Sequence, residues 1–132
     1  MHDTLCALFM STALLAATQS NNPSDWVGVW EGELDGQPSV TLTLAQDNGA
    51  LEGTLVLNII ARDGGQARIV AHEPHTLMEP HVEGLTLSFQ LRRIDETSGP
   101  MRFHVQMTSR EKATIHCLNC GDAPVVEISK QD

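Results

Sequence analysis

Aromatic residues are scarce in this chain of 132 residues: they make up 4% of it, and tyrosine is absent. A core with so few rings must be mainly aliphatic. The length suits one domain with a single modest core and is too short for two such domains. The sequence therefore predicts one small domain whose core consists mostly of leucine, isoleucine and valine.

Basic residues are also scarce, with eight lysines and arginines against 17 acids and a formal net charge of −9. Nucleic acids and anionic membrane surfaces both require clustered basic side chains, so neither is an expected partner. All eight bases lie from Arg62 onward, whereas the stretch 21–61 holds six acids and no base. This asymmetry fits a solvated acidic surface or, alternatively, acidic and basic strands that meet across a seam.

No apolar run in the chain is long enough to cross a bilayer comfortably. The longest, 5–17, has the length typical of the core of a secretory signal peptide. We therefore predict a signal peptide over 1–18, a linker over 19–25 and a domain over 26–132 that is secreted or periplasmic and not membrane-embedded. The start lacks Lys and Arg, and no Ala-x-Ala triplet follows, so an N-terminal helix packed on the domain is the alternative.

A helical period is missing after residue 25. Apolar and polar residues instead alternate with a period of two, which is typical of strands with one buried and one wet face. Asp-Gly and Asn-Gly pairs near residues 35, 48 and 63 supply tight turns. The pattern predicts eight strands, at 28–35, 38–46, 51–62, 66–72, 85–94, 101–109, 112–118 and 125–130.

Eight antiparallel strands joined mostly by tight turns favour an up-and-down β-barrel, because closure removes the exposed edges of a flat sheet. A β-sandwich is the alternative, in which the one long connection would cross between two sheets. That connection is 73–84, where Pro74 and Pro80 each remove a backbone donor. We expect a long loop there, or a broken strand at the edge of the sheet.

Gly28-x-Trp30 opens the first strand, and the strand meander covers nearly all of 26–130. In these features the chain resembles the calycin group of small barrels, which comprises lipocalins, fatty-acid-binding proteins and avidins. Residues 48–53 (Asn-Gly-x-Leu-x-Gly) also resemble an avidin-type hairpin. The opening Gly-x-Trp-x-Gly-x-Leu resembles that of small exported bacterial proteins, a likeness that implies no activity.

The calycin resemblance implies a barrel whose mouth binds a small, often apolar molecule, with Trp30 packed across the closed end. Two features of these families are missing from this sequence. The later lipocalin motif requires a tyrosine, and the ligand set of the avidins requires several tryptophans and a tyrosine. Biotin is therefore not an expected ligand.

The residues predicted to point into the barrel carry no ionisable group. Catalysis inside the barrel would need an acid, a base or a nucleophile, so we expect no enzyme activity and no cofactor. Two possibilities stay open: a core filled by its own side chains, or an apolar cavity for one small ligand. The alternation of apolar and polar residues along the predicted strands also places Ile59 and Leu85 on the inward face. The predicted ligand lining is Leu57, Leu87, Phe89, Leu91, Met101, Phe103, Val105 and Met107.

Three histidines fall in or beside the irregular segment, where Glu-Pro-His occurs twice, six residues apart. His72, His75 and His81, with a nearby glutamate, are candidate ligands for Zn²⁺ or Cu²⁺. Their spacing matches no established ligand pattern, and prolines hinder the convergence of three rings. We therefore favour a solvated loop over a metal site. His104 and His116 fall on outward strand positions and are expected to be surface residues.

Cys117 and Cys120 form a Cys-x-x-Cys motif near the last turn. A zinc knuckle would need two further ligands close by, and a redox motif normally opens a helix in a βαβ unit. A short disulfide is the favoured interpretation, two free thiols the second, and metal or redox chemistry the last. Removal of 1–18 would take away Cys6 and leave this pair, which suits an oxidising compartment.

Taken together, the sequence predicts a non-catalytic, exported, lipocalin-like barrel that binds a small apolar molecule. The alternative is a structural or protein-interaction module with a filled core and no ligand. A lesser alternative is metal binding by the histidines of 72–81. The sequence gives no basis for an oligomeric state.

Overall fold

Short turns and alternating strands build one antiparallel sheet. The computed structural model describes residues 22–93 and 99–132. A short 3-10 helix, η1 (Pro23–Trp26), precedes the sheet, and no helix among the described residues is long and apolar enough to span a membrane. The strands are β1 (Gly28–Leu34), β2 (Gln37–Asp47), β3 (Ala50–Asp63), β4 (Gln66–Thr76), β5 (Met78–Glu83), β6 (Thr86–Leu91), β7 (Met101–Ser109), β8 (Lys112–Cys117) and β9 (Val126–Lys130).

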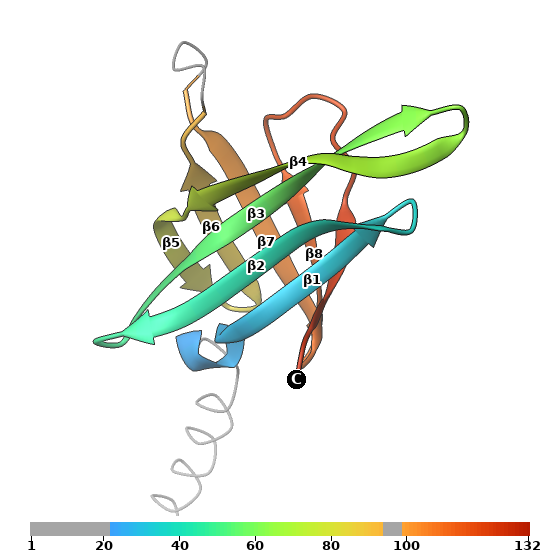
Figure 1. Cartoon of the computed structure of the whole chain (residues 1–132). Coiled ribbons are helices and arrows are strands. Elements are labelled where there is room, and N and C mark those ends of the chain that lie inside the picture. The colour runs from blue at the N-terminus through green and yellow to red at the C-terminus, as the bar shows by residue number, and fades with distance from the viewer. Residues whose placement is uncertain (1–21, 94–98) are drawn as a thin grey trace, which may run out of the picture.

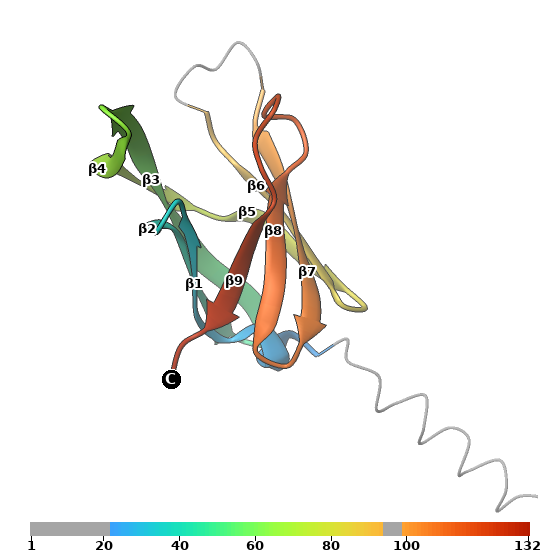
Figure 2. The ribbon, with the colours of Figure 1, turned by 90° about the vertical axis from the view of Figure 1, so that its right-hand side faces the viewer.

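The nine strands belong to a single sheet with the order β4-β3-β2-β1-β9-β8-β7-β6-β5. The sheet curls into a half-barrel (Figures 1 and 2). All-β, up-and-down antiparallel topology is therefore confirmed, and the strands form one sheet rather than the two of a sandwich. The predicted closure into a barrel was wrong, because β4 and β5 remain as the two edges of the sheet. The predicted signal peptide lies outside the described residues, as does 94–98.

The predicted count of eight strands was wrong by one, because 73–84 is not a loop. The strand expected to stop at residue 72 runs on to Thr76, and β5 follows after a single residue, Leu77. Both prolines of this segment lie in strands at the two edges of the sheet, where a missing N–H is tolerated. The expected alternative, a broken strand at an edge, describes this segment correctly.

Buried apolar side chains from all parts of the sheet form one core. It comprises Trp26, Trp30, Val40, Leu42, Leu44, Leu51, Leu55, Leu77, Leu87, Phe89, Leu91, Phe103, Val105, Met107, Ala113, Ile115, Cys117, Val126 and Ile128. The inward placement of Ile59 and Leu85 was wrong, since they are 40% and 47% exposed. The β2–β3 ladder ends at Leu57, so Ile59 lies on a hairpin that runs on beyond the barrel (Figure 1), and Leu85 lies in the turn before β6.

One end of the half-barrel is closed by η1 and two tryptophans. Trp26 and Trp30 are both fully buried, with ring centroids 5.7 Å apart. The Trp30 indole Nε1–H donates to the carbonyl of Trp26 at 3.0 Å, which satisfies the polar end of the buried ring. Lys130 from β9 places its Nζ 5.1 Å from the Trp30 ring centroid and donates to the carbonyl of Asp25. This end therefore ties the helix, the first strand and the last strand together.

Two buried or half-buried glycines allow neighbouring strands to approach closely. A Cβ on Gly32 would lie 2.6 Å from the carbonyl oxygen of Glu127 and 2.8 Å from Cγ2 of Ile128, both on β9. A Cβ on Gly53 would collide with the carbonyl of Thr43 on β2. Glycine is required at these positions because the opposing atoms are backbone or core atoms that cannot move aside freely.

Candidate functional site

The sheet is open between β4 and β5, although these strands are consecutive in the chain. β4 pairs with β3, β5 pairs with β6, and β4 and β5 are the two edges of the sheet. The chain bends between them at Leu77, whose side chain is buried and whose N–H donates to the carbonyl of Gly53 at 3.0 Å. Glu79 then adopts a φ of 50°. The bend separates β4 from the end of β6 and leaves a gap in the wall.

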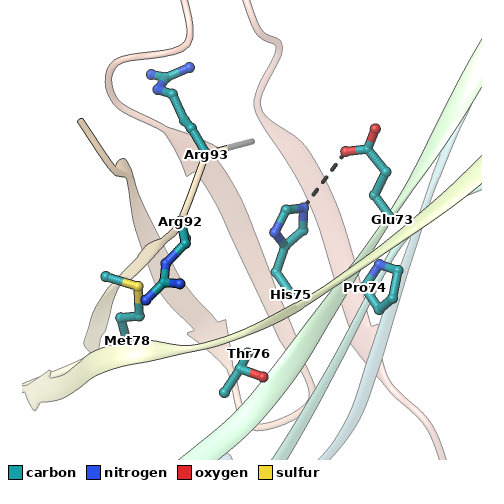
Figure 3. A pocket seen from close by; sticks show the side chains of 7 residues that line it. All are labelled: Glu73, Pro74, His75, Thr76, Met78, Arg92 and Arg93. Carbon is teal, nitrogen blue, oxygen red and sulfur yellow. Dashed lines mark ion pairs between the residues drawn. The ribbon is translucent and has the colours of Figure 1, made fainter. Parts of the chain in front are cut away.

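A cavity of about 590 Å³ occupies this gap, which we call the seam (Figure 3). Its lining comes from β4, from the start of β5 and from the residues that follow β6. An adjoining cavity of about 180 Å³ shares Met78, Arg92 and Arg93. The lining of the seam is Glu73, Pro74, His75, Thr76, Met78, Arg92 and Arg93.

His75 brings a buried nitrogen without a hydrogen-bond partner to the seam. Its side chain is 12% exposed, and its Nε2 is buried without a hydrogen-bond partner among the described residues. The nearest carboxylate oxygen, Oε1 of Glu73, lies 3.7 Å away, beyond normal hydrogen-bond distance. A buried polar atom without a partner costs free energy. A ligand atom in the seam would therefore find a hydrogen-bonding group that the protein leaves unused.

Two arginines lie on the other wall of the seam, across from His75. Figure 3 shows His75 between Glu73 on one side and Arg92 and Arg93 on the other. Arg93 is fixed, because its Nε donates to the carbonyl of Gly99 at 3.0 Å and its Nη2 to that of Asn119 at 2.8 Å. Arg92 is exposed and has no ion pair or hydrogen bond within the described part of the chain. The seam thus holds one anchored and one available guanidinium.

A separate cavity, of about 190 Å³, lies at the end of the half-barrel remote from Trp30, and we call it the mouth. Its walls are mainly apolar and come from β1, β2 and β3 on one side and β7, β8 and β9 on the other. Cys117 and Cys120, which are joined by a disulfide, form part of the wall. The chain therefore has an apolar hollow at the mouth and a larger, more polar one at the seam.

The predicted ligand-lining residues divide between the mouth and the core. Leu57, Met101 and Phe103 line the mouth. Phe103 also stacks on Phe89, with ring centroids 5.3 Å apart. The other members of the predicted set are buried in the core: Leu87, Phe89, Leu91, Val105 and Met107.

The three candidate metal ligands of 72–81 do not converge. His72 lies on the exposed face of β4, with its Nδ1 2.6 Å from Oδ1 of Asn58. His75 points into the seam, and His81 is exposed on β5. Within residues 22–93 and 99–132, no group of three or more histidine, cysteine or acidic side chains could hold a metal ion. The alternation along β4 is the reason, because residues three apart project from opposite faces of a strand.

Sequence reasoning missed most of the seam, including both arginines and Met78. The segment 73–84 was expected to be irregular, and Arg92 falls on an outward position near the end of a predicted strand. The available signals were the two prolines and the isolated Leu77 between polar residues. They indicate a break in a strand, but not which distant segment the break would face.

Comparison with protein-family models, curated proteins and solved structures found no match. The curled antiparallel sheet is compatible with a calycin-like barrel, and no family assignment follows from it. In the seam, cationic and hydrogen-bonding groups line a partly apolar hollow, a combination that suits recognition of an anionic group on a small molecule.

Proposed function

We propose that this protein is a non-catalytic binding protein for a small molecule that joins an apolar body to an anionic group, and that the seam is its binding site. The size and lining of the seam carry the proposal. At about 590 Å³ the seam falls within the usual range of ligand pockets, about 300–1,000 Å³, whereas the mouth at about 190 Å³ falls below it.

The proposed anion site is on the wall of the seam that carries Arg92. The Arg92 guanidinium offers charge-assisted hydrogen bonds to a carboxylate, sulfonate or phosphate. The Nε2 of His75 points toward Glu73 and has no hydrogen-bond partner among the described residues, so it is available to a polar atom in another part of the ligand (Figure 3). Glu73 lies on the far side of His75 from the arginines (Figure 3), so its charge directs an anion toward Arg92. Pro74 and Met78 supply apolar surface for the remainder of the ligand.

The resemblance to calycins also supports the proposal, because the closed barrels of that group carry small molecules. Export belongs to the same proposal. It is supported by the signal-like segment 1–18 and by the disulfide between Cys117 and Cys120, because structural disulfides persist in oxidising compartments.

The test compares a fluorescent dansyl-labelled medium-chain carboxylic acid with its uncharged amide. We expect the acid to bind the wild type and the amide to bind at least about tenfold more weakly, since a hydrogen bond to a charged group contributes about 1.5–3 kcal/mol. Arg92→Gln should remove that difference, and Arg110→Gln, an exposed arginine in the β7–β8 turn, should preserve it. Failure of both probes to bind, or equal binding of both to the wild type, would contradict the proposal.

Exposed apolar residues on the β3–β4 hairpin favour a second candidate function, protein interaction. Ile59 and Val70 are 40% and 48% exposed on the part of the hairpin that extends beyond the barrel (Figure 1), and β4 is an edge of the sheet. Edge strands recruit partner strands by main-chain hydrogen bonds. Light scattering of the wild type and of Val70→Lys tests this candidate, which requires an assembly that the substitution disrupts.

A further inference from the structure

Histidines gather in one row on the outer face of the sheet, away from the seam. The ladders place His81 of β5 opposite Ser88 of β6, Ser88 opposite His104 of β7, and His104 opposite His116 of β8. The residues that flank His104 on β7 and His116 on β8 are buried, so both imidazoles project outward. His104 and His116 are thus direct cross-strand neighbours, although twelve positions separate them in the chain.

Directly opposed residues of an antiparallel pair have Cβ atoms about 4.5–5.5 Å apart. Two imidazoles that project from such a pair can both place a nitrogen about 2.0–2.1 Å from one Zn²⁺ ion. The sheet fixes both Cα positions, so binding of the ion costs little backbone conformational entropy. Neutral imidazole is a preferred ligand of Zn²⁺, and water completes a tetrahedral shell where the protein supplies only two ligands.

The charges around the pair are mixed. Thr114 faces Glu127 of β9, so Glu127 lies diagonally across from His116 and its carboxylate favours a nearby cation. Arg102 precedes His104 on the same face and opposes a cation there. Glu79 lines the same shallow hollow as Arg102 and His104 and offsets part of that positive charge. Ser88, the other cross-strand neighbour of His104, is neutral.

We propose that His104 and His116 form a two-histidine binding site for a divalent transition metal ion such as Zn²⁺, on the outer face of β7 and β8. The site is independent of the proposed ligand site at the seam. It differs from the candidate set at 72–81 because it depends on strand register rather than on closeness in sequence.

Imidazole NMR signals of the full chain, prepared without a histidine tag, test the site during titration with Zn²⁺ alone. The protein has six histidines, and single-histidine variants assign their signals. The signals of His104 and His116 should shift together, at a lower Zn²⁺ concentration than that of His81. His104→Ala should abolish the early shift of His116, and His116→Gln, which keeps a polar side chain at this half-buried position, should abolish that of His104.

His81→Ala is the matched control, because His81 lies on the same face in the same row but opposite Ser88. This variant should leave the joint shift of His104 and His116 unchanged. The amide spectrum reports whether each variant remains folded. The proposal is overturned if the pair responds only at the concentration that shifts His81, or if either member keeps its early shift without the other.

Discussion

The pairing of β1 with β9, which we call the paired seam, differs from the gap between β4 and β5, which is the open seam, in the contacts that join the two strands. Between β1 and β9 the first and last strands pair, Gly32 allows close approach, and Lys130 covers the ring of Trp30. Between β4 and β5 the chain is continuous, yet the ladder is interrupted, and a cavity with an unpaired His75 nitrogen occupies the break. Pairing and close packing are thus concentrated where β1 meets β9, whereas polar groups without protein partners are concentrated between β4 and β5, where we propose that the ligand binds.

The largest effect is expected from Trp30→Ala, which empties the closed end. Truncation of a fully buried large aromatic residue costs about 3–5 kcal/mol of unfolding free energy. Urea unfolding followed by circular dichroism measures the loss. Val125→Ala, at a side chain that is 57% exposed, is the control and should change stability by no more than about 0.5 kcal/mol. Similar losses in both variants would contradict a core centred on Trp30.

Gly32→Ala should have the next largest effect, because the added methyl group meets the Glu127 carbonyl and the Ile128 side chain. Overpacking of this kind typically costs about 1–3 kcal/mol. Glu33→Ala, at the exposed neighbouring position, serves as the control in the same urea experiment. If Gly32→Ala were as stable as Glu33→Ala, close approach of β1 and β9 would not be required.

Lys130→Met should weaken the paired seam modestly. It removes the cation above the Trp30 ring, a contact worth about 0.5–1 kcal/mol at an exposed site, and the hydrogen bond to the Asp25 carbonyl. A decrease in the thermal midpoint is the readout. Lys112→Met, at an exposed position of β8, should leave that midpoint nearly unchanged. Equal midpoints for the two variants would rule out a contribution from Lys130.

A substitution in the open seam should weaken binding without lowering stability. His75→Leu replaces a buried nitrogen without a partner by apolar atoms, so stability should stay within about 0.5 kcal/mol of the wild type or rise. Binding of the dansyl-labelled acid should weaken at the same time. A loss of more than about 1 kcal/mol of stability would show that His75 supports the fold rather than a ligand.

Much of the sheet could be predicted from the sequence because its signals are local. Alternation along 38–46 or 101–109 reports which face of a strand is buried, and Asn48-Gly49 reports a tight turn. Both predicted strands agree with β2 and β7 to within one residue at each end. The burial of Trp30 also followed from its place on the first strand.

The seam and the histidine row could not be predicted, because they depend on contacts between segments far apart in the chain. The prolines and Leu77 indicate a break in a strand, but Glu79 adopts a positive φ without being glycine or asparagine, so its residue type does not predict this conformation. Arg92 and His75 are 17 positions apart in the chain and come together only in the lining of the seam. His104 and His116 each resemble an ordinary surface residue until the β7–β8 register places them opposite each other.

The methionine methyl groups allow the most direct test of the central claim that the open seam is the binding site. Met78 lines the seam, Met101 lines the mouth and Met107 is buried in the core. During titration of ¹³C-methyl-labelled protein with the dansyl-labelled acid, the Met78 signal should shift while those of Met101 and Met107 stay in place. A shift of Met101 with an unchanged Met78 would place the ligand at the mouth and contradict this account.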